Sequence, residues 1–118
     1  MNNDCQKDLI IFNLLLGWEV IHLSKRGKKV TIRLREFPEK PNRFLRITFS
    51  KCELAAIIDF NEGKQIEDFS AFDSNTCSLS EVKMEPDGIF SLFLFNRDGR
   101  LGILKVLPGD ISFNFTSK

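Results

Sequence analysis

The sequence has no tyrosine, one histidine, one tryptophan and only three cysteines. The absence of tyrosine removes a common catalytic acid and a common hydrogen-bonding residue of interfaces. Zinc in proteins usually has about four nitrogen or sulfur ligands in close pairs, so Cys5, Cys52, Cys77 and His22 predict no metal site. An odd number of widely spaced cysteines also argues against a disulfide framework. We therefore expect reduced thiols, no cofactor and a cytoplasmic protein.

Long apolar runs are missing as well. No stretch approaches the roughly 18 apolar residues that a membrane-spanning helix needs, so we expect no membrane association. The segment LIIFNLLLG (9–17) is apolar enough for the core of a signal peptide. However, Asp4, Lys7 and Asp8 precede it in place of a cationic region, and no small-residue cleavage site follows. We interpret it as a buried element of the folded protein.

The sequence contains no catalytic motif. There is no GxSxG motif, and the glycines near the C-terminal end lack the spacing of a phosphate-binding loop. His22 could serve as the base of a small enzyme that takes carboxylates from the middle of the chain. A single histidine without a motif more often has a structural or surface role, so we expect no enzymatic activity.

Apolar and polar residues alternate with period two from Trp18 onward, as in VTIRLREF (30–37) and RFLRITFS (43–50). The chain has 118 residues, which predicts a single domain spanning 1–118. We predict a mainly β (α+β) fold, an antiparallel meander of about seven or eight strands that forms a curved sheet or sandwich. IFSLFLFN (89–96) is apolar on both faces, which is typical of a central strand covered on both sides.

One N-terminal helix completes the expected fold. Asn3 or Asp4 could cap a helix that runs from about Cys5 to Leu16 and stops at Gly17. Its apolar residues cover most of the circumference, so we expect burial on more than one side. A strand is the alternative, since periodicity cannot decide for so short a segment.

The charges are strongly segregated along the chain. Residues 1–51 contain eleven Lys or Arg and five Asp or Glu, a net charge of +6. Residues 52–87 contain two and nine, a net charge of −7. Residues 88–118 contain four and two, a net charge of +2. The overall charge of +1 therefore hides a basic first part and an acidic middle.

The acidic middle also carries phenylalanines in the segment NEGKQIEDFSAFDSN (61–75). This segment is either a solvated loop fastened to the core by its phenylalanines, or a docking surface for a basic protein. In the second interpretation the carboxylates orient the partner and the rings anchor it. The candidate partner-binding residues are Asp59, Glu62, Glu67, Asp68, Phe69, Phe72 and Asp73.

The basic part supplies an alternative function, a small nucleic-acid-binding domain. Its candidate residues are Lys25, Arg26, Lys28, Lys29, Arg33, Arg35 and Arg46. We expect no aromatic residue on the same outer face to stack bases, and basic outer strand faces often serve only solubility or edge protection. Nucleic-acid binding therefore ranks below protein binding.

Three parts of the sequence together resemble the immunity proteins of bacterial polymorphic toxin systems, particularly those of contact-dependent growth inhibition. They are VTIRLREF and FLRITFSKCEL, the acidic middle, and DGIFSLFLFNRDGRLGILKV. The resemblance implies a non-enzymatic inhibitor that binds a cognate toxin domain, often a basic nuclease, and it assigns no individual residue. A structural subunit that self-associates through its Phe-rich strands is a further alternative, and the oligomeric state is left open.

Overall fold

The structure is a computed structural model that describes residues 3–36, 43–66, 69, 77–96 and 101–116. Within these residues the chain forms one helix and nine antiparallel strands, which confirms the mainly β class with an N-terminal helix. The strand number is nine rather than seven or eight. The elements are α1 (Asn3–Asn13), β1 (Glu19–Arg26), β2 (Lys29–Arg35), β3 (Phe44–Ser50), β4 (Leu54–Asp59), β5 (Gln65–Ile66), β6 (Cys77–Met84), β7 (Phe90–Asn96), β8 (Leu101–Leu107) and β9 (Asp110–Thr116).

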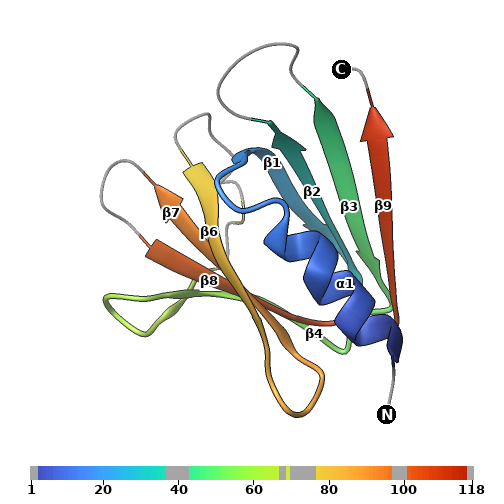
Figure 1. Ribbon diagram of the computed structural model, residues 1–118. Helices are drawn as coiled ribbons and strands as arrows, with labels where there is room; N and C mark the ends of the chain where they lie inside the picture. Colours follow the sequence, from blue (N-terminus) through green and yellow to red (C-terminus); the bar gives the residue numbers. More distant parts are fainter. Residues whose placement is uncertain (1–2, 37–42, 67–68, 70–76, 97–100, 117–118) are drawn as a thin grey trace.

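All nine strands belong to one sheet with the order β5-β4-β8-β7-β6-β1-β2-β3-β9 (Figure 1). β1 to β3 and β6 to β8 form two meanders, as expected from their turn signals. The expectation of a simple meander throughout is wrong, because β4 pairs with β8 and β9 pairs with β3. We call β1, β2, β3 and β9 the first half-sheet, and β4 to β8 the second half-sheet.

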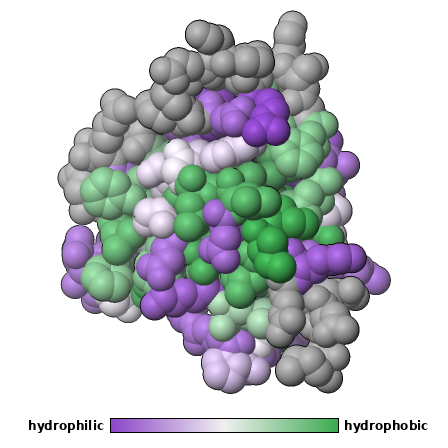
Figure 2. Space-filling model, in the orientation of Figure 1, coloured by the Kyte–Doolittle hydropathy of each residue, from purple (hydrophilic) through white to green (hydrophobic). Residues whose placement is uncertain are grey.

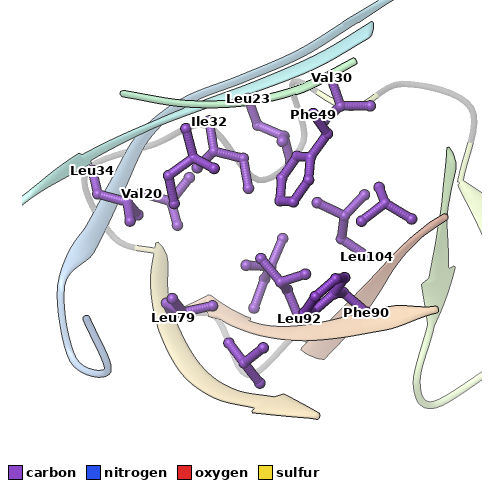
Figure 3. Close-up of a cluster of buried hydrophobic side chains, with 14 of the residues drawn as sticks. Val20, Leu23, Val30, Ile32, Leu34, Phe49, Leu79, Phe90, Leu92 and Leu104 are labelled. Carbon is purple, nitrogen blue, oxygen red and sulfur yellow. The ribbon is translucent and has the colours of Figure 1, made fainter. Parts of the chain in front are cut away.

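The sheet bends where the two half-sheets meet. β1 and β6 share only two residue pairs, Glu19 with Ser78 and Val20 with Cys77. One extra residue interrupts the register in each strand close to this junction, Ile21 in β1 and Ser80 in β6. Bulges of this kind bend a strand and increase its twist. The two half-sheets consequently face each other across a shared core, and Figure 3 shows side chains from both converging there.

Alternation decides which side chains enter this core. In β2, Val30, Ile32 and Leu34 are at most 1% exposed, whereas Thr31 and Arg33 between them are partly exposed. This confirms the alternation predicted from the sequence for this strand. Full burial of one such aliphatic side chain stabilises the folded state by about 1.5–3 kcal/mol.

α1 covers the open side between the half-sheets (Figure 1). Phe12 is fully buried, and its ring lies 6.0 Å from Phe49 in β3, 5.5 Å from Phe90 in β7 and 5.4 Å from Phe113 in β9, measured between centroids. One side chain of the helix therefore contacts both half-sheets. Phe12 is the position in α1 that couples them most directly.

The N-terminal segment is a helix and not a strand, but it ends at Asn13 and not near Leu16. The chain then turns into β1 through Gly17, whose φ of +92° favours glycine. Burial on more than one side is wrong as an expectation, because Ile10 and Leu14 are 63% and 74% exposed. Figure 2 shows the resulting apolar surface over α1. Among the described residues, no helix is long and apolar enough to cross a membrane.

Candidate interaction surface

The described part of the acidic segment begins at the end of β4. The Asp59 carboxylate accepts hydrogen bonds from the backbone N–H groups of Asn61 (2.9 Å) and Glu62 (3.0 Å), so it stabilises the turn that follows the strand. Glu62 itself is exposed. The remaining carboxylates and one of the two rings lie outside the described residues, namely Glu67, Asp68, Phe72 and Asp73.

Phe69 is part of the hydrophobic core, with 8% of its surface exposed. The ammonium group of Lys25 lies 6.0 Å from the centroid of its ring. A cation at this distance from an aromatic ring is attracted by about 0.5–1 kcal/mol at an exposed site. Phe69 thus fastens its segment to the core beside a basic residue, and its ring is not available to a partner.

The outer face of the second half-sheet is apolar. In β7, Phe93 and Phe95 point away from the core, because their neighbours Leu92 and Leu94 are fully buried on the inner side. Phe95 is the register partner of Leu101 in β8, and it is 45% exposed. The expectation that both faces of this central strand are covered is therefore wrong for its outer face.

Other strands extend this apolar face. Phe93 pairs with Ile103 in β8, which pairs in turn with Ile58 in β4. Phe60 follows β4, donates its backbone N–H to the carbonyl of Leu101 (2.8 Å), and is 56% exposed. We call this set the apolar outer patch. Its members are Ile58, Phe60, Phe93, Phe95, Leu101 and Ile103.

Charged residues surround the apolar outer patch. The register places Glu81 of β6 beside Phe93, and the Lys83 ammonium lies 5.8 Å from the centroid of the Phe93 ring. Glu81 and Lys83 form an ion pair of 3.7 Å. Residues 53–66, 77–96 and 101–107 together hold six carboxylates and three ammonium groups, a net charge of −3. The described part of the second half-sheet and its turns therefore has a net negative charge.

A hydrogen-bonded group of three side chains lies at one end of the same face. Glu85 accepts hydrogen bonds from the Lys105 ammonium and the Ser91 hydroxyl, both at 2.7 Å. The hydrogen bond from Lys105, followed by that from Ser91, lowers the pKa of the Glu85 carboxyl. Because its Oε2 accepts both hydrogen bonds, Glu85 connects the end of β6 to β7 and β8 and is less available to a partner.

The basic residues predicted from the sequence lie on the first half-sheet. Arg26, Lys28 and Lys29 surround the β1–β2 turn, and all three are exposed. Arg35 donates a hydrogen bond from Nε to the Glu19 carboxylate (3.0 Å), which is only 8% exposed, so this arginine has a structural role. Lys25 lies beside Phe69, as described above. The remaining two candidates are Arg33 and Arg46, on the outer faces of β2 and β3.

The described residues do not form a catalytic arrangement around His22. This histidine is exposed on β1, where its register partner is Arg33. In the part of the chain that the structure describes, no group of three or more His, Cys, Asp or Glu residues could hold a metal ion. A shallow hollow of about 230 Å³ lies at the β8–β9 turn, far in sequence from His22. It is lined by Lys51, Glu53, Leu107, Pro108 and Gly109.

The exposed members of the apolar outer patch were missed by sequence reasoning, which placed the aromatic anchors at Phe69 and Phe72. The signal was present in β7, where apolar residues occupy both faces. A scan against protein-family models found no match, and searches of the curated proteins and of the solved structures found none either. The site therefore rests on geometry alone.

Proposed function

We propose that the protein is a non-enzymatic binding module that docks a basic protein partner on the apolar outer patch. The observation that carries this proposal is an uncovered aromatic face on a central strand of a half-sheet whose described residues have a net negative charge. The resemblance to immunity proteins favours a bacterial toxin domain as the partner, specifically a nuclease with a basic surface. In that case the protein neutralises its partner by covering the surface on which the partner acts, and it does so in the cytoplasm.

The physical basis is the usual division of roles in a protein interface. Large rings that are half-exposed in the free protein lose water contact on binding, and such residues often contribute most of the affinity. Phe95 and Phe60 have the required exposure, at 45% and 56%. The surrounding carboxylates, including Glu62 and Glu81, steer a basic partner and fix its orientation. The Lys83 ammonium lies over the ring of Phe93, so this ring is already ordered before the partner binds.

The state of the thiols supports a reducing compartment. Cys52 and Cys77 are buried in the core. Burial raises the pKa of the Cys52 thiol, and the nearby Lys25 charge opposes this only in part. Both thiols therefore behave as small apolar side chains of the core, as expected for an intracellular inhibitor.

The decisive experiment starts from the neighbouring gene: a toxin domain encoded immediately upstream is the expected partner, and its absence would count against the proposal. Binding to that domain, in a catalytically inactive form, is then measured by isothermal titration calorimetry. The double variant Phe60→Asp/Phe95→Asp should bind at least about 100-fold more weakly, since both anchors are lost. The matched control is Ile10→Asp/Leu14→Asp, which changes two apolar residues that are even more exposed, one in α1 and one directly after it. It should bind like the wild type. Circular dichroism confirms that both variants are folded.

Two results would overturn the proposal. Unchanged affinity of the Phe60/Phe95 variant would remove the apolar outer patch as the site, and loss of affinity only in the Ile10/Leu14 variant would move the site to α1. Reversing Glu67, Asp68 and Asp73 to lysine tests the wider acidic segment separately. If that variant associates at the wild-type rate in low salt, the segment is a solvated loop and not part of the docking surface.

A further inference from the structure

Two arginines lie directly opposite each other on the outer face of the first half-sheet. Arg33 in β2 and Arg46 in β3 are register partners on adjacent strands, which lie about 4.8 Å apart. Like charges placed opposite each other destabilise a sheet. Within the described residues, neither guanidinium forms an ion pair or a hydrogen bond, whereas Arg35 on the same face is paired with Glu19. The two charges are therefore held together without a described counter-charge.

The strand register places polar groups around this pair. His22 of β1 lies beside Arg33, and Asn114 of β9 lies beside Arg46, so one row crosses all four strands. Phe44 lies two residues before Arg46 on the same face of β3 and is partly exposed, which corrects the expectation that no aromatic residue shares this face. The next row across the four strands consists of hydroxyl side chains, Ser24, Thr31, Thr48 and Ser112.

We propose that this face binds the phosphodiester backbone of single-stranded nucleic acid, with Arg33 and Arg46 as the central phosphate ligands. The guanidinium fork matches the oxygens of a phosphate, and two adjacent forks can hold the same or neighbouring phosphates. The hydroxyl row supplies further donors to phosphate and sugar oxygens. Phe44 offers a ring on which a base can stack.

The shape of the face favours a single strand over other polyanions. The outer face of a four-stranded sheet presents no helix or ribbon to enter a duplex groove, whereas sheets of this kind bind unstacked strands. Stable binding to a membrane surface requires apolar groups that enter the bilayer. The described outer positions include the large apolar residues Phe44 and Ile21, and both are partly buried. This proposal shares no residue with the apolar outer patch, so either can fail without the other.

The test is fluorescence anisotropy with labelled single-stranded DNA and RNA of about 12 nucleotides, at about 50 mM salt and above. We expect the wild type to bind both, with an affinity that falls steeply as salt rises. Arg33→Glu/Arg46→Glu should bind at least about tenfold more weakly. Arg33→Gln/Arg46→Gln should reduce the slope of log affinity against log salt by about 1.4, as expected for two lost phosphate contacts.

The matched control is Lys7→Glu/Lys64→Glu, which makes the same change in net charge at two exposed lysines away from this face. It should retain most of the affinity. An equal loss in both charge-reversed variants would mean attraction by net charge alone and would overturn the proposed site, as would failure of the wild type to bind at low salt. Binding to vesicles with anionic headgroups in preference to the oligonucleotides would assign the face to lipid and would also overturn the proposal.

Discussion

The two half-sheets have similar inner faces and different outer faces. β2 and β7 both have seven residues, and both bury branched or aromatic side chains toward the same core. On their outer faces, β2 presents Thr31 and Arg33, whereas β7 presents Phe93 and Phe95. Packing leaves little freedom on the inner side, because interiors are close-packed. The outer side is free to differ, and both of the interaction surfaces that we propose lie there.

The largest effect is expected where the two half-sheets share one side chain. Phe12→Ala removes a fully buried ring that contacts three strands, and should cost about 3–5 kcal/mol. Urea unfolding followed by the fluorescence of Trp18, the only tryptophan, measures this loss. If the alanine variant is unfolded without urea, Phe12→Leu gives a smaller, measurable change. A cost below about 1 kcal/mol for Phe12→Ala would mean that α1 does not couple the half-sheets.

Two adjacent residues of β7, Leu94 and Phe95, allow the inner and outer faces to be compared by their effect on the free energy of unfolding. Leu94→Ala creates a cavity in the core and should lower the free energy of unfolding by about 2–4 kcal/mol. Phe95→Ala removes a larger side chain, but one that is 45% exposed, and should cost about 1 kcal/mol or less. Urea titration of both variants gives the comparison. Equal losses would show that the outer face of β7 is packed as tightly as the inner face.

Two arginines on one strand provide a smaller contrast. Arg35→Ala leaves the buried Glu19 carboxylate without its partner and should cost about 1–3 kcal/mol. Arg33→Ala should change stability by no more than about 0.5 kcal/mol, and should stabilise slightly if repulsion from Arg46 is relieved. Thermal unfolding of the two variants measures both effects. A larger loss for Arg33 than for Arg35 would contradict the assignment of their roles.

The smallest expected effect concerns acid sensitivity of the second half-sheet. Hydrogen bonds from Lys105 and Ser91 hold the pKa of Glu85 below its ordinary value of 4.5. Because the folded state lowers this pKa, the contribution to stability is present above the ordinary value and is lost as pH falls through the lowered one. Glu85→Gln should therefore be less stable than the wild type at pH 7, and the difference should shrink below about pH 4. A difference that does not depend on pH would exclude this linkage.

Period-two alternation made the inner and outer faces of β2 and β3 predictable from the sequence. In β2 and β3 one face is polar, so the pattern alone identified Val30, Ile32 and Leu34 as buried and Arg33 as outward. In β7 both faces are apolar, and no local pattern can tell a covered face from an uncovered one. The exposure of Phe95 depends on what lies over it in the folded protein.

Long-range contacts explain the remaining differences. The pairing of Arg35 with Glu19 and the approach of Lys25 to Phe69 join residues that are distant in sequence, so charge counting along the chain could not anticipate either. The helix was expected, but the exposure of Ile10 in α1, and of Leu14 directly after it, depends on how much of this segment the two half-sheets cover. Segregation of charge was visible in the sequence. The strand order places the basic strands and the acidic segment in different half-sheets, so the two outer faces differ.

The position of Phe12 also has a consequence for how the protein is made. α1 leaves the ribosome before any strand, yet the ring of Phe12 near its C-terminal end packs against residues of β3, β7 and β9. Contacts between segments so distant in sequence form late, because the intervening chain must first be ordered. During synthesis the apolar residues of the helix therefore remain exposed until β9 has emerged. Transiently exposed apolar surface of this kind is prone to aggregation.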